Sequence, residues 1–144
     1  IFKACCGKII CKGCIYVMDK EARGSRKIEC LCAFCRTPAC KTAADETDRV
    51  KKMAESGNAN AFNQLAGYYA RGVRGMPQDW AKANELYLKA GELGCADGYC
   101  NLGNSYYVGR GVEMDKKRAK HSWELAAMKG DVDARHNLGC MEGS

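Results

Sequence analysis

Residues 101–130 decide the fold, and they read NLGNSYYVGRGVEMDKKRAKHSWELAAMKG. The first part of this stretch repeats an earlier one at an offset of 37: Leu102, Gly103, Tyr106 and Gly109 match Leu65, Ala66, Tyr69 and Gly72. The second part repeats at an offset of 36: Asp115, Ala119, Trp123, Ala126 and Gly130 match Asp79, Ala83, Tyr87, Ala90 and Gly94. Self-similarity at a period of this length is typical of stacked helical hairpins.

The spacing inside each unit predicts two helices. In the first helix, Leu65 and Tyr69 lie one turn apart, as do Leu102 and Tyr106 in the next unit, so each pair shares a buried face. The second helix is expected to bury Ala83, Leu86, Tyr87, Ala90 and Leu93. Cys95 and Cys100 are interpreted as small core residues. We therefore expect Tyr87 and Trp123 to belong to the core, together with the paired Leu and Tyr residues.

Residues that start and stop helices occur at equivalent positions of the units. Side-chain caps are expected at Asn60, Asp97 and Asp133 for the first helices, and at Asp79 and Asp115 for the second. Gly72 and Gly109 are the expected left-handed stops of the first helices. The boundaries are a half repeat at 45–57, full repeats at 60–94 and 97–130, and a half repeat at 133–144.

The motif string resembles the Sel-one-like repeat of the tetratricopeptide superfamily. The resemblance rests on Gly109-Arg110-Gly111-Val112, Asp115, Ala119, residues 123–127 and Gly130. It implies a right-handed α-solenoid whose concave face binds peptides or proteins, rather than an enzyme. The expected binding residues lie on the first helices: Asn63, Gln64, Tyr68, Asn101, Ser105, Tyr107, Arg135 and His136.

Cysteines and positive charge are concentrated before the repeats. Eight of the 11 cysteines lie at or before Cys40, and residues 1–41 carry nine Lys and Arg against three acids. Clustered CxxC pairs favour metal ligation in a reducing compartment over disulfides, so we expect an intracellular protein, cytoplasmic or nuclear. The Lys and Arg residues would offset the charge of a thiolate-bound zinc, which makes a nucleic-acid partner the weaker interpretation. No apolar run approaches the length needed to span a bilayer.

The cysteine spacing allows two zinc arrangements. Cys11, Cys14, Cys32 and Cys35 form two CxxC pairs separated by 17 residues, which suits one four-cysteine site. The string also resembles the second half of a RING finger. That resemblance implies that Cys5, Cys6 or both join Cys32 and Cys35 at one zinc, while Cys11 and Cys14 serve another. The leading pair is missing, Lys8 occupies the usual His position, and Ala33 replaces the usual Pro. The number of zinc ions, one or two, is therefore left open by the sequence.

RING fingers position a ubiquitin-conjugating enzyme and its bound ubiquitin. The resemblance implies that Arg36 contacts ubiquitin, and that Ile15 and Ala33 lie at the enzyme-binding groove. The expected architecture is mainly α, with a small zinc module at 1–41 joined to the solenoid. The expected function is a RING-type ubiquitin ligase whose repeats recruit a client. The alternative is a non-enzymatic adaptor with a structural zinc module, and a zinc-ribbon nucleic-acid binder is the third interpretation. Because the chain starts at Ile1 rather than Met and stops at Ser144 inside a repeating pattern, we interpret it as a fragment or as a gene model clipped at both ends.

Overall fold

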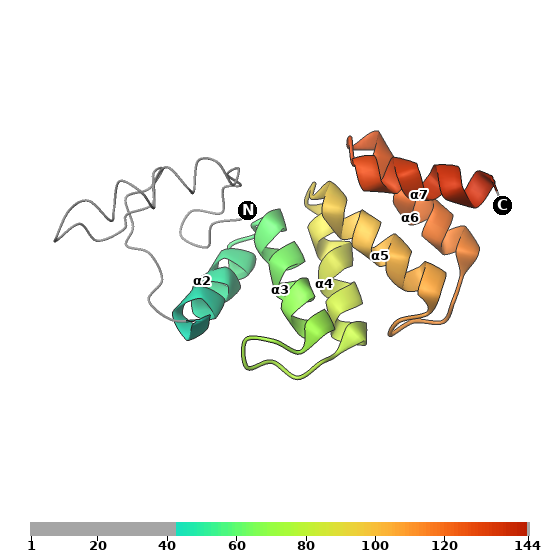
Figure 1. Ribbon diagram of the computed structural model, residues 1–144. Coiled ribbons are helices and arrows are strands. Elements are labelled where there is room, and N and C mark those ends of the chain that lie inside the picture. The colour runs from blue at the N-terminus through green and yellow to red at the C-terminus, as the bar shows by residue number, and fades with distance from the viewer. Residues whose placement is uncertain (1–42, 144) are drawn as a thin grey trace, which may run out of the picture.

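The computed structural model describes residues 43–143, which contain six α-helices. They are α2 (Ala43–Glu55), α3 (Ala59–Arg71), α4 (Trp80–Glu92), α5 (Ala96–Val108), α6 (Lys116–Met128) and α7 (Val132–Glu142). Figure 1 shows them following one another in chain order from α2 to α7. Each helix packs mainly on the helices that precede and follow it in the chain. The described residues are therefore an all-α stack of consecutive helical hairpins, as the repeat predicts.

The second helix of each unit begins at the predicted residue. Asp79 and Asp115 are the N-caps of α4 and α6, and each carboxylate accepts from the backbone N–H three residues later, at 3.0 and 3.1 Å. The loops before them also close in the same way. The N–H of Asp79 donates to the carbonyl of Tyr69, and the N–H of Asp115 to that of Tyr106, each at 2.9 Å. These equivalent bonds confirm the register of the repeat.

The predicted caps of the first helices are wrong by two residues. The helices were expected to start at Asn60, Asp97 and Asp133, whereas the structure places their N-caps at Asn58, Cys95 and Asp131. The Asn58 side chain accepts from a backbone N–H at 3.1 Å and Asp131 does so at 2.7 Å, but Cys95 gives no side-chain cap. Asn58 and Asp131 are earlier capping residues, so α3 and α7 start earlier, whereas α5 starts at the equivalent position without a side-chain cap. Asn60 and Asp97 are therefore helical residues.

The loops after the first helices differ by one residue, and one arginine accommodates the difference. Gly72 and Gly109 end α3 and α5 in the left-handed region, with φ of 63° and 76°, as predicted. In the longer loop Arg74 also has positive φ, at 62°, which is uncommon for a residue with a side chain. Its guanidinium pairs with Glu46 of α2 at 3.1 Å, which ties this loop to the preceding helix.

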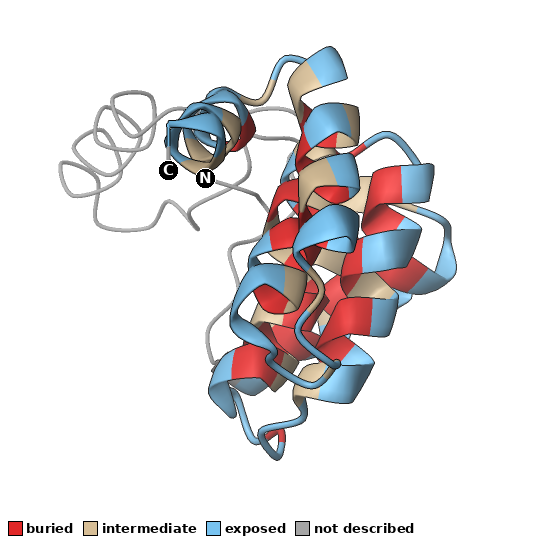
Figure 2. Cartoon of the chain, turned by 90° about the vertical axis from the view of Figure 1, so that its right-hand side faces the viewer, coloured by how far each residue is buried: buried red, intermediate tan, exposed pale blue. Residues whose placement is uncertain are grey.

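Buried residues gather where neighbouring helices meet, and exposed residues cover the outside (Figure 2). The predicted core is confirmed at Ala83, Tyr87, Ala90 and Trp123, and Cys95 and Cys100 are buried as expected. Leu93 was predicted to be buried, but it is 51% exposed. This residue is the C-cap of α4, with φ −80° and ψ 2°, so it lies beyond the last turn of the helix. Leu86 is half-buried against the core.

The half units at the two ends bury different amounts. Val50 and Ala54 of α2 are buried, and Met53 packs against the same cluster, so α2 covers one side of α3 as a preceding helix would. By contrast, Ala134 is the one buried residue among those described in α7. Leu138 and Met141 are partly buried against α6 and α5 side chains. The apolar residues of the last helix are thus partly covered.

Candidate protein-binding groove

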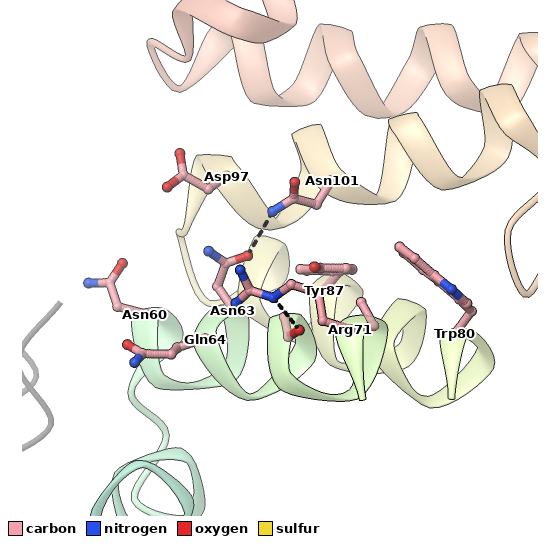
Figure 3. Close-up of a pocket in the computed structure, with 10 residues that line it drawn as sticks. Asn60, Asn63, Gln64, Arg71, Trp80, Tyr87, Asp97 and Asn101 are labelled. Carbon is pink, nitrogen blue, oxygen red and sulfur yellow. Dashed lines mark hydrogen bonds between the residues drawn. The ribbon is translucent and has the colours of Figure 1, made fainter. Parts of the chain in front are cut away.

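A groove of about 560 Å³ lies between α3 and α5, with α4 forming its floor and one wall. Its lining combines amides, two aromatic rings and one charge of each sign (Figure 3). The lining residues are Asn60, Asn63, Gln64, Gly67, Ala70, Arg71, Trp80, Tyr87, Asp97 and Asn101. The set from α3 recurs every three or four residues, which is the spacing of one helix face. The groove is therefore a product of the helix period and of the stacking of successive units.

Side-chain amides join the two sides of the groove. The Nδ2 of Asn101 on α5 donates to the Oδ1 of Asn63 on α3, at 3.2 Å. Within residues 43–143, this bond leaves the Nδ2 of Asn63 and the Oδ1 of Asn101 without a side-chain or backbone partner. Gln64 is used differently, because its Nε2 donates to the Tyr68 hydroxyl at 2.6 Å. One donor of Asn63 and one acceptor of Asn101 thus remain available on the residues that line the groove.

Arg71 occupies the middle of the groove because Gly67 leaves room for it. The Nε of Arg71 donates to the carbonyl of Gly67 at 3.1 Å, one turn earlier on α3. An ideal Cβ on Gly67 would lie 3.3 Å from Nη2 of Arg71 and 3.9 Å from the Tyr87 hydroxyl. Burial raises the pKa of Tyr87, and the charge of Arg71 opposes that rise. Arg71 is therefore held over α3 with its terminal nitrogens facing the groove.

The aromatic wall is positioned by the loop of the following unit. The guanidinium of Arg110 lies 5.2 Å from the centre of the Trp80 ring. The Nδ2 of buried Asn84 donates to the carbonyl of Arg110 at 2.7 Å, which holds the loop on α4. At Gly111 any side chain would collide, since an ideal Cβ would be 2.5 Å from the carbonyl carbon of Trp80. The Trp80 wall is thus built by two repeats together.

A negative charge lies at the other end of the groove. Asp97 is near the start of α5, and Figure 3 places it far from Trp80. Partial burial, a hydrogen bond with Asp131 and the charges of Asp131 and Asp133 raise the pKa of Asp97. Cys100 lies near the same carboxylates, and burial followed by those charges raises its pKa to about 12. Cys100 is therefore a neutral thiol rather than a nucleophile.

The structure divides the residues predicted for partner binding into three groups. Asn63, Gln64 and Asn101 line the groove. Tyr68 and Ser105 were expected on the surface, but they are only 4% and 2% exposed. Tyr68 packs on buried residues of α2, and the Ser105 hydroxyl donates to a carbonyl of its own helix. Tyr107 is 42% exposed but lies outside the groove lining, with its ring 5.4 Å from that of Trp123. Arg135 and His136 are exposed on α7.

Sequence reasoning assigned only Asn63, Gln64 and Asn101 to binding and missed the other seven lining residues, among them Gly67, Ala70 and Tyr87, which was assigned to the core. Asn60 and Asp97 were assigned to helix caps, and Arg71 and Trp80 were given no role. A usable signal was present, because Asn60, Gln64, Gly67 and Arg71 follow one another at helical spacing. Small and polar residues at those positions mark a helix face that no neighbouring helix covers.

The predicted zinc module lies outside the residues that the structure describes. This applies to Cys5, Cys6, Cys11, Cys14, Cys32 and Cys35, and to Ile15, Ala33 and Arg36. Among residues 43–143, His, Cys, Asp and Glu form no group able to hold a metal ion. Of the helices from α2 to α7, none combines the length and the apolar character that a bilayer span requires.

Comparison with known proteins points to Sel1-like repeats. No family model matches the chain. It is 34% identical over 90 residues to HRD3B of Arabidopsis thaliana, an ERAD-associated E3 ubiquitin-protein ligase component, and the match covers 62% of this chain but 14% of that protein. Among solved structures, a Sel1 repeat protein from Oxalobacter formigenes superimposes with a TM-score of 0.66, at 30% identity, over 70% of this chain and 41% of the other.

A second solved structure matches over nearly its whole length. Cysteine rich protein B of Helicobacter pylori gives a TM-score of 0.64 at 28% identity, covering 88% of this chain and 93% of the other. Together with the repeat register, these likenesses show that the described helices have the Sel1-like, or Sel-one-like, repeat fold of consecutive helical hairpins.

Proposed function

We propose that the groove between α3 and α5 holds an extended segment of a partner protein, so that the repeats recruit that partner. The observation that carries the proposal is the Asn63–Asn101 pair. Its remaining donor and acceptor belong to residues that line the groove, and they match the C=O and N–H that an extended backbone presents. Trp80 and Tyr87 supply an apolar surface beside them, and such amphipathic rings are enriched at binding sites.

A groove-filling variant tests this function. Peptides displayed on phage are selected on the full 144-residue chain, and the affinity of the enriched peptides is measured by fluorescence anisotropy. Gly67→Phe places a ring in the groove without changing a backbone donor, so affinity should fall about tenfold or more. Gly139→Phe is the matched control, because it adds the same ring on α7 where an ideal Cβ meets nothing within 4 Å.

The expected result is loss of binding in Gly67→Phe and retained binding in Gly139→Phe, with helical circular dichroism unchanged in both. If no peptide is enriched on the wild-type chain, the groove is not a peptide site. Equal affinity of wild type and Gly67→Phe would move the binding surface elsewhere on the repeats.

The wider proposal is that the recruited partner is presented for ubiquitin transfer. Two observations support it: the RING-like cysteine spacing in residues 1–41, and the likeness to HRD3B, which is named as a ubiquitin-ligase component. In one version, zinc held by Cys11, Cys14, Cys32 and Cys35, together with Cys5, Cys6 or both, supports binding of a ubiquitin-conjugating enzyme, in an intracellular ligase. In the other, the chain is a non-enzymatic adaptor and the zinc module is structural.

Ubiquitin discharge separates the two versions. The chain is mixed with a panel of ubiquitin-loaded conjugating enzymes, and transfer of ubiquitin to free lysine is followed in a single turnover. Acceleration by the wild-type chain that is reduced by Arg36→Ala at equal zinc content would support the ligase. Because the leading cysteine pair is missing, we expect little acceleration from these 144 residues. No acceleration after a CxxC-containing segment is added upstream would favour the adaptor.

A further inference from the structure

Three ion pairs are found among the described residues of the repeats, and Arg71 belongs to none of them. Arg74 pairs with Glu46 at 3.1 Å, Arg118 with Asp115 at 3.5 Å, and Lys120 with Glu142 at 3.5 Å. Within residues 43–143, no carboxylate lies at ion-pair distance from the Arg71 guanidinium. An unpaired arginine lining a groove is a candidate for recognition of an anionic group.

Arg71 is also arranged to bind a carboxylate with little loss of freedom. Its Nε is already bonded to the Gly67 carbonyl at 3.1 Å, which fixes the plane of the guanidinium. The two terminal nitrogens keep their donors, and two parallel N–H groups match the two oxygens of a carboxylate. The missing side chain at Gly67 gives the group its place in the groove, since an ideal Cβ there would be 3.3 Å from Nη2.

The surroundings of Arg71 determine what accompanies the carboxylate. Tyr87 and Trp80 line the same groove, so an apolar side chain next to the acidic one would contact their rings. At the end of the groove away from Trp80, Asp97 lies close to Asp131 and Asp133, and this cluster would repel a second acid. The groove therefore has a middle suited to an acid, at Arg71, and one end that disfavours it, at Asp97, which defines an orientation for the bound segment.

Resting on the proposed peptide-binding function, we infer that the groove selects an acidic segment: a carboxylate binds Arg71, and a neighbouring apolar side chain packs on Trp80 and Tyr87. The carboxylate can belong to Asp, Glu or a C-terminus, because all three present the same two oxygens. Recognition then depends on charge as well as on backbone hydrogen bonds. Binding should accordingly weaken as the salt concentration rises.

A positional-scanning library of fluorescein-labelled decapeptides, made with free and with amidated C-termini, tests the inference on the full chain. Acidic residues or a free C-terminus should be enriched at one position, with an apolar residue next to it. If the best peptide carries Glu at the enriched position, replacing that Glu by Gln should weaken binding about tenfold; if it is recognised by its C-terminus, amidation should have the same effect. In Arg71→Gln the same peptide change should have no effect, and Arg71→Lys should restore part of the affinity.

Lys89→Gln is the control, because it removes the same unit charge from an exposed position of α4 that does not line the groove. It should leave the preference for the acidic peptide intact. If peptides bind but without acidic preference, or if Arg71→Gln keeps that preference, the inference is overturned while the peptide-binding function stands. If the wild-type chain binds no decapeptide, both fail. Helical circular dichroism confirms that each variant is folded.

Discussion

Gly103 and Trp123 are packed so closely that an ideal Cβ on Gly103 would lie 2.5 Å from Cδ1 of the indole ring. The indole Nε1 donates to the carbonyl of Cys100 at 3.3 Å and to the Oδ1 of Asn104 at 3.1 Å, which fixes the ring over α5. The absence of a side chain at Gly103 of α5 thus leaves the space that the Trp123 ring of α6 fills.

Gly103→Ala should therefore destabilise the repeats by about 1–3 kcal/mol, because the methyl group forces the indole or the helices apart. Gly139 is the equivalent residue of α7, and there an ideal Cβ meets nothing within 4 Å. Gly139→Ala should stabilise by up to about 1 kcal/mol through helix propensity. Urea unfolding followed by circular dichroism measures both free energies. Changes of the same sign would contradict the packing described here.

The corrected start of α3 predicts a contrast between two nearby asparagines. Asn58→Ala removes the side-chain acceptor that caps the N–H of Ala61, and should cost about 1 kcal/mol of unfolding free energy. Asn60→Ala should change it by no more than about 0.5 kcal/mol, since Asn60 lies inside the helix and lines the groove. Urea unfolding of the two variants decides the matter. A larger loss in Asn60→Ala would restore the cap predicted from sequence.

Asp97 gives a pH dependence of definite sign. Its pKa is raised in the folded state, so the folded protein binds the proton more tightly than the unfolded chain does. The cost of the ionised carboxylate is absent below the ordinary Asp pKa and is fully present above the raised pKa. Asp97→Asn, which can still donate to Asp131, should stabilise the protein near pH 7 and lose that advantage towards pH 3. Unfolding free energies at both pH values test this; an advantage that grows on acidification would reverse the assignment.

Zinc content tests the cysteine module separately from the repeats. Cys32→Ser and Cys35→Ser should each lower the zinc bound per chain, because three thiolates hold the ion less tightly than four. Cys140→Ser is the control, since Cys140 is an exposed residue of α7 in the repeats. Zinc is measured by elemental analysis after dialysis.

Helical circular dichroism of a 43–144 fragment should survive a chelator; its loss would show that the repeats depend on the metal.

The sequence predicted those parts of the fold that depend on local chemistry. Asp79 and Asp115 cap helices and Gly72 and Gly109 stop them, because a side-chain acceptor or a permissive backbone acts within one turn. It was less informative where several residues offer the same chemistry. Asn58 and Asn60 are both good caps, and only the packing of the whole helix chooses between them.

A single row of apolar residues along α3 did not predict which of its residues are buried near the groove. The pattern favoured Tyr69 over Tyr68 as the buried residue of α3, yet Tyr68 is 4% exposed and Tyr69 is half-buried. The reason is that α3 is covered by α2 on one side and by α4 on the other, so two stripes are buried. The uncovered face between those stripes is what remains for the groove. Arg71 and Trp80 line one groove only when α3 and α4 stack.

The packing of each helix mainly on its neighbours in the chain also has a mechanical consequence. Force applied between Ala43 and Gly143 would pass through the contacts between consecutive helices one after another, because few contacts join helices that are distant in the chain. Such a structure extends by separating one joint at a time. The joint between α6 and α7 is the weakest candidate, because among the described residues of α7 only Ala134 is fully buried. Tension carried by a bound client would therefore be relieved first at that end, while the groove between α3 and α5 keeps its shape.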